Sequence, residues 1–145
     1  MTWARERLNA LKDGKAALPA VVQTLRLGGL DDWGPGWAKK RWAPDAALLN
    51  VDGSMFGGYL AALADQMLAL AALSVLPSDA TMRTVNLSLQ FIRVGRGEPL
   101  QIDGKVVAQS RSLITVACEI KTEEGVLIAT ATAQQIVQPS APVHR

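Results

Sequence analysis

The stretch Gly58-Tyr-Leu-Ala-Ala-Leu-Ala-Asp-Gln-Met-Leu-Ala-Leu-Ala-Ala-Leu-Ser-Val-Leu76 decides the fold of this chain. It is rich in good helix formers and apolar on nearly every side, which predicts a helix in the protein core. One acid, Asp65, lies within it. Burying a lone carboxylate costs several kcal/mol unless it is paired, hydrogen-bonded or facing a wet cleft. We therefore expect Asp65 to be either satisfied by neighbours or functional.

The length of this stretch approaches that of a transmembrane helix. Asp65 and Gln66 near its middle disfavour that interpretation, as do the amphipathic strands that follow and need a surface to pack on. The first residues, Met-Thr-Trp-Ala-Arg-Glu-Arg-Leu, lack the uninterrupted apolar region of a signal peptide. We expect a cytoplasmic protein with no membrane partner.

Composition indicates one globular domain over residues 1–145, with 49% hydrophobic and 19% charged residues. The net charge of +2 is too small to suggest a nucleic-acid partner. We interpret the basic triplet 39–41 as a solvated strand or loop rather than a phosphate contact. The single cysteine, Cys118, excludes an intramolecular disulfide and alternates with apolar residues, so we expect a buried thiol.

The first part of the chain predicts short elements. Residues 2–12 read as an amphipathic helix, and residues 20–27 as a second one that ends at a glycine pair. Together they form an N-terminal helical extension, residues 1–30. The region 30–53 is rich in Gly, Pro and Trp and predicts loops around one strand at 36–43.

After the long helix the hydrophobic period becomes two, which is typical of strands. One face of the first strand is predicted to carry Val85, Leu87, Leu89 and Phe91, and the other Thr84, Asn86, Ser88 and Gln90. Further strands are expected near 99–109, 112–122 and 125–137, followed by a flexible tail at 138–145. A buried helix followed by an antiparallel meander predicts an α+β fold in which the sheet wraps the helix.

Several kinds of catalytic site are excluded because the sequence lacks the residues that they need. The only histidine, His144, lies in the predicted tail, so histidine-based hydrolysis and dehydration lack their general base. No zinc ligand set and no glycine-rich nucleotide fingerprint is present in the sequence, so no metal is expected. A carboxylate assisted by backbone donors is the remaining catalytic device.

Such a device is visible where the long helix begins. Gly57 and Gly58 would let a substrate carbonyl approach unpaired N–H groups at the positive end of the helix dipole. Asp65 lies two turns further on, about 10 Å along the helix. Because that separation is long for one reaction centre, we expect Asp65 to serve a site completed by the glycine pair of a second subunit. The alternative is a glycine pair that caps the helix and an acid bonded to nearby groups, and the residues alone leave both open.

The segment Asn50-Val-Asp-Gly-Ser-Met-Phe-Gly-Gly-Tyr-Leu-Ala-Ala-Leu-Ala-Asp65 resembles the signature of hotdog-fold acyl-CoA thioesterases of the phenylacetate-pathway (PaaI-like) group. That signature has Asn-x-x-Gly-x-x-His-Gly-Gly, then Leu-Ala-Asp with the acid seven residues after the second glycine. Residues 84–93 look like the family's second strand and residues 125–135 like its last. The resemblance covers roughly residues 45 to 137.

This resemblance implies a five-stranded antiparallel sheet around one long helix, assembled into homodimers or homotetramers with active sites at the dimer interface. Gly58 would donate its N–H to the thioester carbonyl, and Asp65 would be general base or nucleophile. Asn50 would orient water or the carbonyl, and Thr84 would supply an assisting hydroxyl. The implied reaction is hydrolysis of acyl-CoA to free acid and CoA, with CoA part of the substrate and no separate cofactor.

The sequence departs from the family signature at one position: Phe56 stands where the family has a histidine before the glycine pair. Phenylalanine cannot donate a hydrogen bond, so an alternative is a non-catalytic module that binds acyl thioesters or serves assembly on the same fold. Beside Gly57, Phe56 and Tyr59 are candidates for an acyl or aryl pocket, and ordinary interface packing is the alternative for each. Arg93 is a candidate for a CoA phosphate, with a solvated strand-end charge as its alternative.

Overall fold

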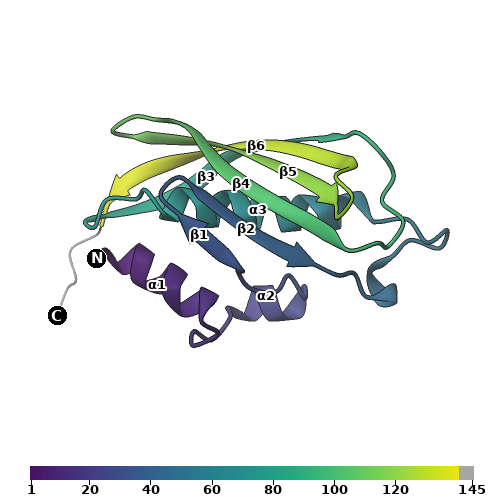
Figure 1. The fold of residues 1–145 in the computed structure, drawn as a ribbon. Helices are drawn as coiled ribbons and strands as arrows, with labels where there is room; N and C mark the ends of the chain where they lie inside the picture. The colour runs from purple at the N-terminus through teal and green to yellow at the C-terminus, as the bar shows by residue number, and fades with distance from the viewer. Residues whose placement is uncertain (141–145) are drawn as a thin grey trace.

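A computed structural model describes residues 1–140, and Figure 1 shows the path of the chain. The predicted helices and strands are present, with ends that differ by a few residues. In chain order they are α1 (Trp3–Lys12), α2 (Ala20–Thr24), β1 (Asp32–Gly34), β2 (Trp37–Trp42), the 3-10 helix η1 (Ala46–Leu48), α3 (Gly57–Leu73), β3 (Ala80–Phe91), β4 (Leu100–Gln109), β5 (Leu113–Thr122) and β6 (Leu127–Pro139).

The strands form one antiparallel sheet in the order β1-β2-β4-β5-β6-β3. The sheet has six strands where five were predicted, because residues 32–34 form a short edge strand instead of a loop. Gly36, with a φ of 85°, permits the tight turn that folds β1 back onto β2. At the opposite edge, β3 pairs only with β6, so the predicted meander is confirmed for β4, β5 and β6 but not for β3.

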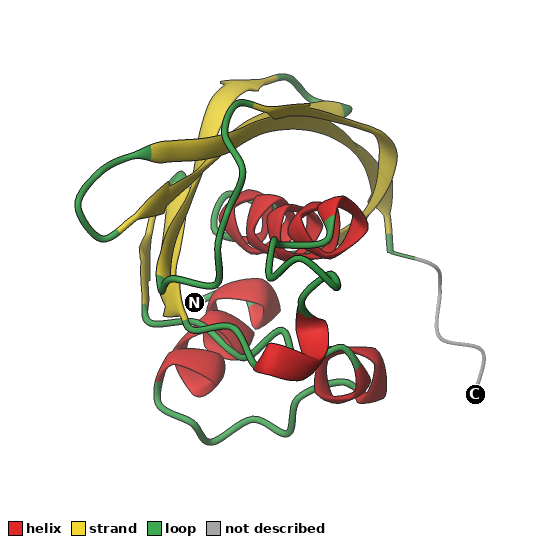
Figure 2. Ribbon diagram, turned by 90° about the vertical axis from the view of Figure 1, so that its right-hand side faces the viewer, coloured by secondary structure: helices red, strands yellow, loops and turns green. Residues whose placement is uncertain are grey.

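Helix α3 lies in the concave side of the curved sheet, as Figure 2 shows. The helix packs against strands β2 to β6, and α1 contacts it from the side away from the sheet. The predicted α+β arrangement, with a sheet wrapped around one long helix and short N-terminal helices, is therefore confirmed.

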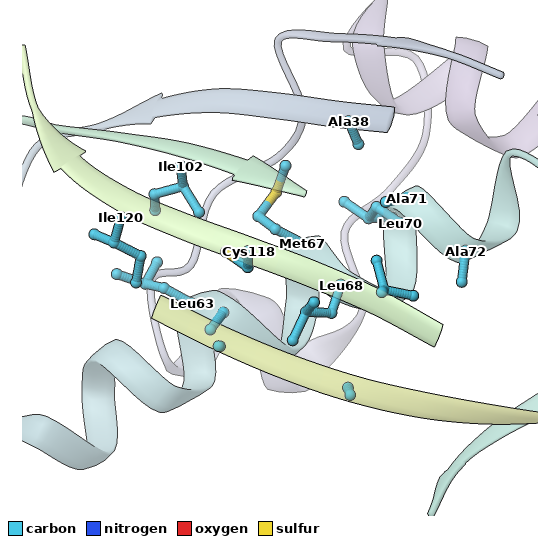
Figure 3. Packing of buried hydrophobic residues seen from close by; sticks show 14 of the residues in the cluster. Ala38, Leu63, Met67, Leu68, Leu70, Ala71, Ala72, Ile102, Cys118 and Ile120 are labelled. Atoms are coloured by element: carbon cyan, nitrogen blue, oxygen red, sulfur yellow. The ribbon is translucent and has the colours of Figure 1, made fainter. Parts of the chain in front are cut away.

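The core forms where inward side chains of the sheet meet α3 (Figure 3). Leu63 and Met67 of the helix pack with Ile102 of β4 and Ile120 of β5, and all four are almost fully buried. Cys118 shares this layer as a free thiol, as predicted. Its burial raises the pKa of the thiol to about 12, so it stays protonated and inert at neutral pH.

The predicted faces of β3 are partly wrong because the strand contains a bulge. Its register against β6 shifts between Thr84 and Asn86, which leaves Val85 as the extra residue. Thr84 is therefore opposite the inward-facing Gln135 of β6, and Leu87 is opposite Ala133. The bulge brings Thr84 onto the inner face with the apolar residues Leu87, Leu89 and Phe91 rather than with the outward polar residues.

The start of the predicted flexible tail is also corrected. Residues 138 and 139 belong to β6, where they pair with Thr81 and Ala80 of β3. The Ser140 N–H donates to the Asp79 carbonyl at 2.8 Å, which holds the end of the strand. The remaining part of that prediction, residues 141–145 with His144, lies outside the described residues.

The sheet approaches α3 most closely at Gly104 of β4. A Cβ atom at this position would lie 2.7 Å from the carbonyl oxygen of Met67 and 3.2 Å from the Ala71 Cβ. The first neighbour is helix backbone, which cannot rotate away. Glycine is thus needed for the helix to sit this deep in the sheet.

We expect Gly104→Ala to lower the free energy of unfolding by about 1–3 kcal/mol, because the new methyl group overpacks the contact between helix and strand. Urea denaturation followed by circular dichroism would measure this loss. Lys105→Ala, on the exposed side of the same strand, should change stability by no more than about 0.5 kcal/mol. Equal stabilities for the two variants would show that the close approach does not constrain the fold.

Candidate active site

The N-terminus of α3 carries two backbone donors without acceptors. The cap residue Phe56 makes no side-chain capping bond, and its carbonyl accepts from the N–H groups of Tyr59 (3.0 Å) and Leu60 (3.2 Å). The N–H groups of Gly57 and Gly58 find no acceptor within residues 1–140. Two donors therefore remain free at the positive end of the helix dipole.

Aromatic rings flank these donors closely. A Cβ at Gly57 would lie 3.1 Å from the Phe91 ring, and one at Gly58 would lie 3.0 Å from the Phe56 ring. Larger residues would force the rings to move. Glycine at both places keeps the backbone accessible between them.

An open pocket of about 260 Å³ adjoins this turn. Gly57 and Leu60 line it from α3, and Phe91 and Arg93 line it from the end of β3 and the following residues. The Arg93 side chain is exposed, with only a 3.4 Å contact to the Leu127 carbonyl. Phe56 is 59% exposed beside the same turn. The structure thus brings Phe56, the glycine pair and Arg93 together.

Asp65 lies on the open face of α3 and is exposed. The helix is covered by the sheet on one side and by the N-terminal helices on the other, which leaves a strip of small residues uncovered. This strip contains Gly58, Ala62 and Ala69, with Asp65 between them at helical spacing.

The Asp65 carboxylate makes no hydrogen bond or ion pair within the described part of the chain. Its pKa is raised above the usual value of 3.8 by desolvation from the surrounding apolar groups. An unpartnered carboxylate with a raised pKa has the properties of a general base.

Asn50 lies in the turn that leads into α3. Its Nδ2 donates to the Ser54 hydroxyl at 2.9 Å, and its backbone N–H donates to the Ser54 carbonyl at 2.8 Å. The Met55 N–H donates to the Gly95 carbonyl, which ties this turn to the segment after β3. Asn50 is therefore held in place near the helix N-terminus, with its side-chain oxygen unused within residues 1–140.

Thr84 lies on β3, away from the glycine turn, and is exposed. Its hydroxyl donates to Oε1 of Gln135 at 2.9 Å. Gln135 was missed from the sequence because it belongs to an alternating strand, where a polar residue reads as solvent-facing. The bulge at Val85 places Thr84 opposite Gln135, and no local sequence pattern predicted this bulge.

The sequence model of the thioesterase superfamily matches residues 52–129, which include the glycine turn and Asp65. The chain belongs to the thioesterase superfamily. By this membership it is a thioester hydrolase, and the predicted family resemblance is confirmed. A search of curated proteins gave no match.

Solved structures share this superfamily member's hotdog fold. This chain is 29% identical to a phenylacetic acid degradation-related protein of Ralstonia eutropha JMP134, over 89% of this chain and 98% of that one, with a TM-score of 0.78. A Haemophilus influenzae thioesterase is 21% identical over 100% of this chain and 97% of its own, with a TM-score of 0.81. A hypothetical thioesterase of Streptococcus pneumoniae TIGR4, solved with coenzyme A, is 24% identical over 78% and 87%, with a TM-score of 0.70.

None of the helices in residues 1–140 combines the length and hydrophobicity that a membrane crossing needs. The same residues hold no group of three or more side chains suited to a metal ion. The absence of a metal and of a separate cofactor stays a prediction.

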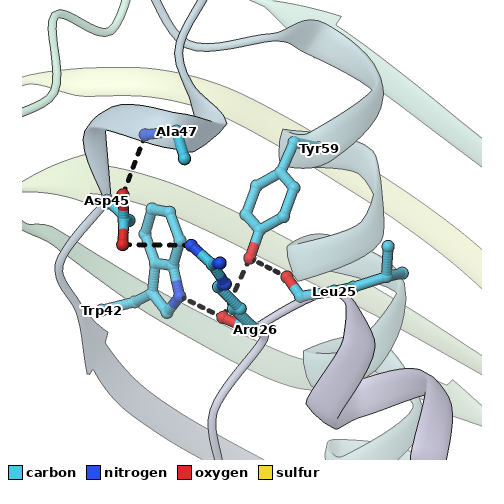
Figure 4. A network of polar contacts seen from close by, with 6 residues as sticks. All are labelled: Leu25, Arg26, Trp42, Asp45, Ala47 and Tyr59. Carbon is cyan, nitrogen blue, oxygen red and sulfur yellow. Dashed lines mark hydrogen bonds and ion pairs between the residues drawn. The ribbon is translucent and has the colours of Figure 1, made fainter.

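Tyr59 does not line the pocket of this thioesterase; it packs in the interior, as Figure 4 shows. Its hydroxyl donates to the carbonyls of Leu25 and Arg26, and its ring centroid lies 5.2 Å from that of Trp42. The Trp42 Nε1–H donates to the same Arg26 carbonyl at 3.0 Å. Helix α3 and β2 thus hold the N-terminal extension at Arg26, whose φ of 54° is unusual for a residue with a side chain.

Lys40 is buried, with only 2% of its surface exposed, whereas the sequence predicted a solvated side chain. It lies on the inner face of β2, where its ammonium donates to the Leu27 carbonyl and to Oε1 of Gln66. Gln66 in turn donates to the Gly28 carbonyl at 2.8 Å. Burial lowers the pKa of Lys40 to about 7. This buried polar network fastens residues 27–28 to the helix turn that carries Asp65.

We expect the stability of the wild type, relative to Lys40→Met, to rise between about pH 7 and pH 10. The native state releases the Lys40 proton near pH 7, whereas the unfolded state holds it until its ordinary pKa of 10.5. The unfolded state therefore binds more protons in this window, so the free energy of unfolding increases with pH there. Urea denaturation at several pH values would measure the difference.

Lys39→Met is the matched control, because Lys39 is the exposed neighbour on the same strand. Its unfolding free energy should follow the wild-type pH dependence. Parallel pH curves for wild type and Lys40→Met would contradict a buried, pKa-shifted lysine.

Proposed function

We propose that this superfamily member hydrolyses an acyl-CoA thioester to the free acid and CoA. The observation that carries the proposal is the pairing of free N–H groups at Gly57 and Gly58 with an unpartnered carboxylate, Asp65, on the same open face of α3. Backbone donors of this kind stabilise the oxyanion of an acyl-transfer intermediate, and a nearby base activates water.

In the proposed reaction the thioester oxygen binds at the Gly58 N–H, close to the free N–H of Gly57. Asp65 takes a proton from a water molecule as the water oxygen attacks the carbonyl carbon. The resulting tetrahedral oxyanion is held by the backbone donors and the helix dipole. It collapses by breaking the carbon–sulfur bond, and the departing CoA thiolate receives the proton from Asp65.

The spacing of these groups supports a site shared by two subunits. Within one chain, Gly58 and Asp65 are separated by two helical turns, about 10 Å. Strand β3 supplies an edge with an unpaired side, and Val85, Leu87 and Phe91 expose apolar surface on it. We infer a homodimer formed along β3, in which the open strips of the two α3 helices face each other; a homotetramer would be a pair of such dimers.

Substrate contacts follow from the pocket beside the glycine turn. Arg93 offers a charged group for a CoA phosphate, and the exposed rings of Phe56 and Phe91 offer apolar surface to the acyl or aryl group. Coenzyme A is present in the Streptococcus pneumoniae relative. The buried free thiol of Cys118 is compatible with a reducing compartment, and a cytoplasmic location is part of the proposal.

We expect Asp65→Asn to abolish release of free CoA from a panel of short, medium, long-chain and aryl acyl-CoAs while leaving fold and assembly intact. For the wild type, kcat/KM should fall as the pH drops through the raised pKa of Asp65, because a protonated carboxyl cannot accept the proton of water. Thiol detection with a chromogenic disulfide would report CoA release at each pH.

Undiminished turnover by Asp65→Asn, or a flat acidic limb, would contradict the role of Asp65. Saturable binding of acyl-CoA without turnover would instead favour the non-catalytic alternative, for which the observation is Phe56 in place of the family histidine. Gain of turnover in Phe56→His would then identify that substitution as the cause.

Mixing two inactive variants tests the shared site. Gly58→Pro removes the N–H donor at a first-turn position where proline is tolerated, and Asp65→Asn removes the base. If each site combines Gly58 of one subunit with Asp65 of the other, random reassortment should restore about a quarter of wild-type activity. The measurement is CoA release after the two variants are unfolded and refolded together.

Gly58→Ala adds a similar Cβ beside Phe56 but keeps the N–H, so it should lose far less activity than Gly58→Pro. No recovery in the mixture, although size exclusion shows mixed dimers, would place both groups of each site in a single subunit.

A further inference from the structure

Gln135 is a polar side chain in an apolar layer. It is 1% exposed and lies on the inner face of β6, in line with the buried alanines 131 and 133. Its strand neighbours are Ile114 of β5, which is fully buried, and Thr84 of β3, which is exposed. Gln135 thus stands at the boundary between the core and the open inner face of the sheet edge.

The side-chain amide of Gln135 lowers the stability of the fold. Its Oε1 accepts the Thr84 hydroxyl at 2.9 Å, but its Nε2 is the buried side-chain nitrogen or oxygen that has no partner within residues 1–140. Leaving a donor unsatisfied in the interior is unfavourable, and an apolar residue would serve this layer better. Packing alone therefore does not explain a glutamine here.

Strand β3, which pairs with β6, contains a second irregular feature next to the hydrogen bond between Thr84 and Gln135. The bulge at Val85 interrupts the ladder between β3 and β6, and without it Thr84 would lie on the outer face. Two independent departures from regular packing thus bring one hydroxyl onto the inner face and hold it there. That face is the one on which α3 packs against the sheet.

The hydrogen bond to Gln135 determines whether the Thr84 hydroxyl can donate to a ligand or accept from it. A threonine hydroxyl has one proton and two lone pairs. Because Thr84 gives its proton to Gln135, its oxygen can only accept a hydrogen bond from a ligand. Thr84 is exposed whereas Gln135 is not, so the ligand meets the threonine alone.

We propose that Gln135 is a positioning residue that fixes Thr84 as the acceptor for the attacking water of thioester hydrolysis. One O–H of the water donates a hydrogen bond to the Thr84 oxygen and keeps its proton, while the other O–H gives its proton to Asp65. A lone pair of the water oxygen is then directed at the thioester carbon. This inference rests on the proposed function, since it assigns an orientation to the water of that reaction.

The test compares Gln135→Met, which keeps the length of the side chain but cannot bond Thr84, with Thr84→Val and with the double variant. Gln135→Met should lower kcat roughly 10-fold or more while KM changes little, because misorientation acts on the chemical step. Its thermal stability should equal or exceed that of the wild type, since a buried unsatisfied donor is removed. The double variant should lose no more than Thr84→Val alone.

Gln134→Met is the matched control. Gln134 is the next residue on β6, and its Oε1 accepts from Asn86 of β3 at 2.7 Å on the outer face. It loses an equivalent bond between the same two strands, so its kcat should stay at the wild-type value. Gln135→Glu keeps an acceptor oxygen for the Thr84 proton and should recover most of the loss seen in Gln135→Met.

A wild-type kcat in Gln135→Met would overturn the proposal, as would losses that multiply in the double variant or an equal loss in Gln134→Met. If Asp65→Asn is inactive while Gln135→Met is fully active, this inference alone fails. If the wild type releases no CoA from any substrate, or Asp65→Asn is as active as the wild type, the proposed function fails and this inference fails with it.

Discussion

The depth at which α3 sits in the sheet constrains every other feature of this protein. Gly104 lets the strand backbone approach the Met67 carbonyl directly, so the helix can be surrounded by the curved sheet. Small residues on α3, such as Ala71, complete the contact. The helix is then covered from one side by strands and from the other by the N-terminal extension, and a single narrow strip of it stays open. That strip holds the groups with catalytic potential.

The N-terminal extension, which precedes the region matched by the superfamily model, is joined to the core by polar contacts rather than by packing alone. Carbonyls of residues 25–28 accept hydrogen bonds from side chains of α3 and β2, including the buried ammonium of Lys40. Buried polar networks are costly unless their members are satisfied, and they fix one arrangement when they are. This network therefore sets which side of α3 remains open.

Local patterns in the sequence predicted the elements well. The apolar stretch after Gly58 predicted α3, alternation predicted the long strands, and the spacing from the glycine pair to Asp65 indicated the family. The environment of single side chains was predicted less well: Lys40 is buried rather than solvated, and the alternatives left open for Asp65 and Tyr59 depended on what covers them. Each of these depends on which distant segment covers a given face, and hydrophobic periodicity carries no such information.

The sequence by itself determined the long helix, the alternating strands and the donors at the helix N-terminus, because these follow from the order of residues within a few turns of chain. Only the tertiary structure decided that Thr84 faces inward, since a one-residue bulge reverses the side on which a strand residue lies. It also decided that Gln135 receives the Thr84 proton. Contacts between residues far apart in the chain are set by how the elements pack, and strand register is fixed only when neighbouring strands meet.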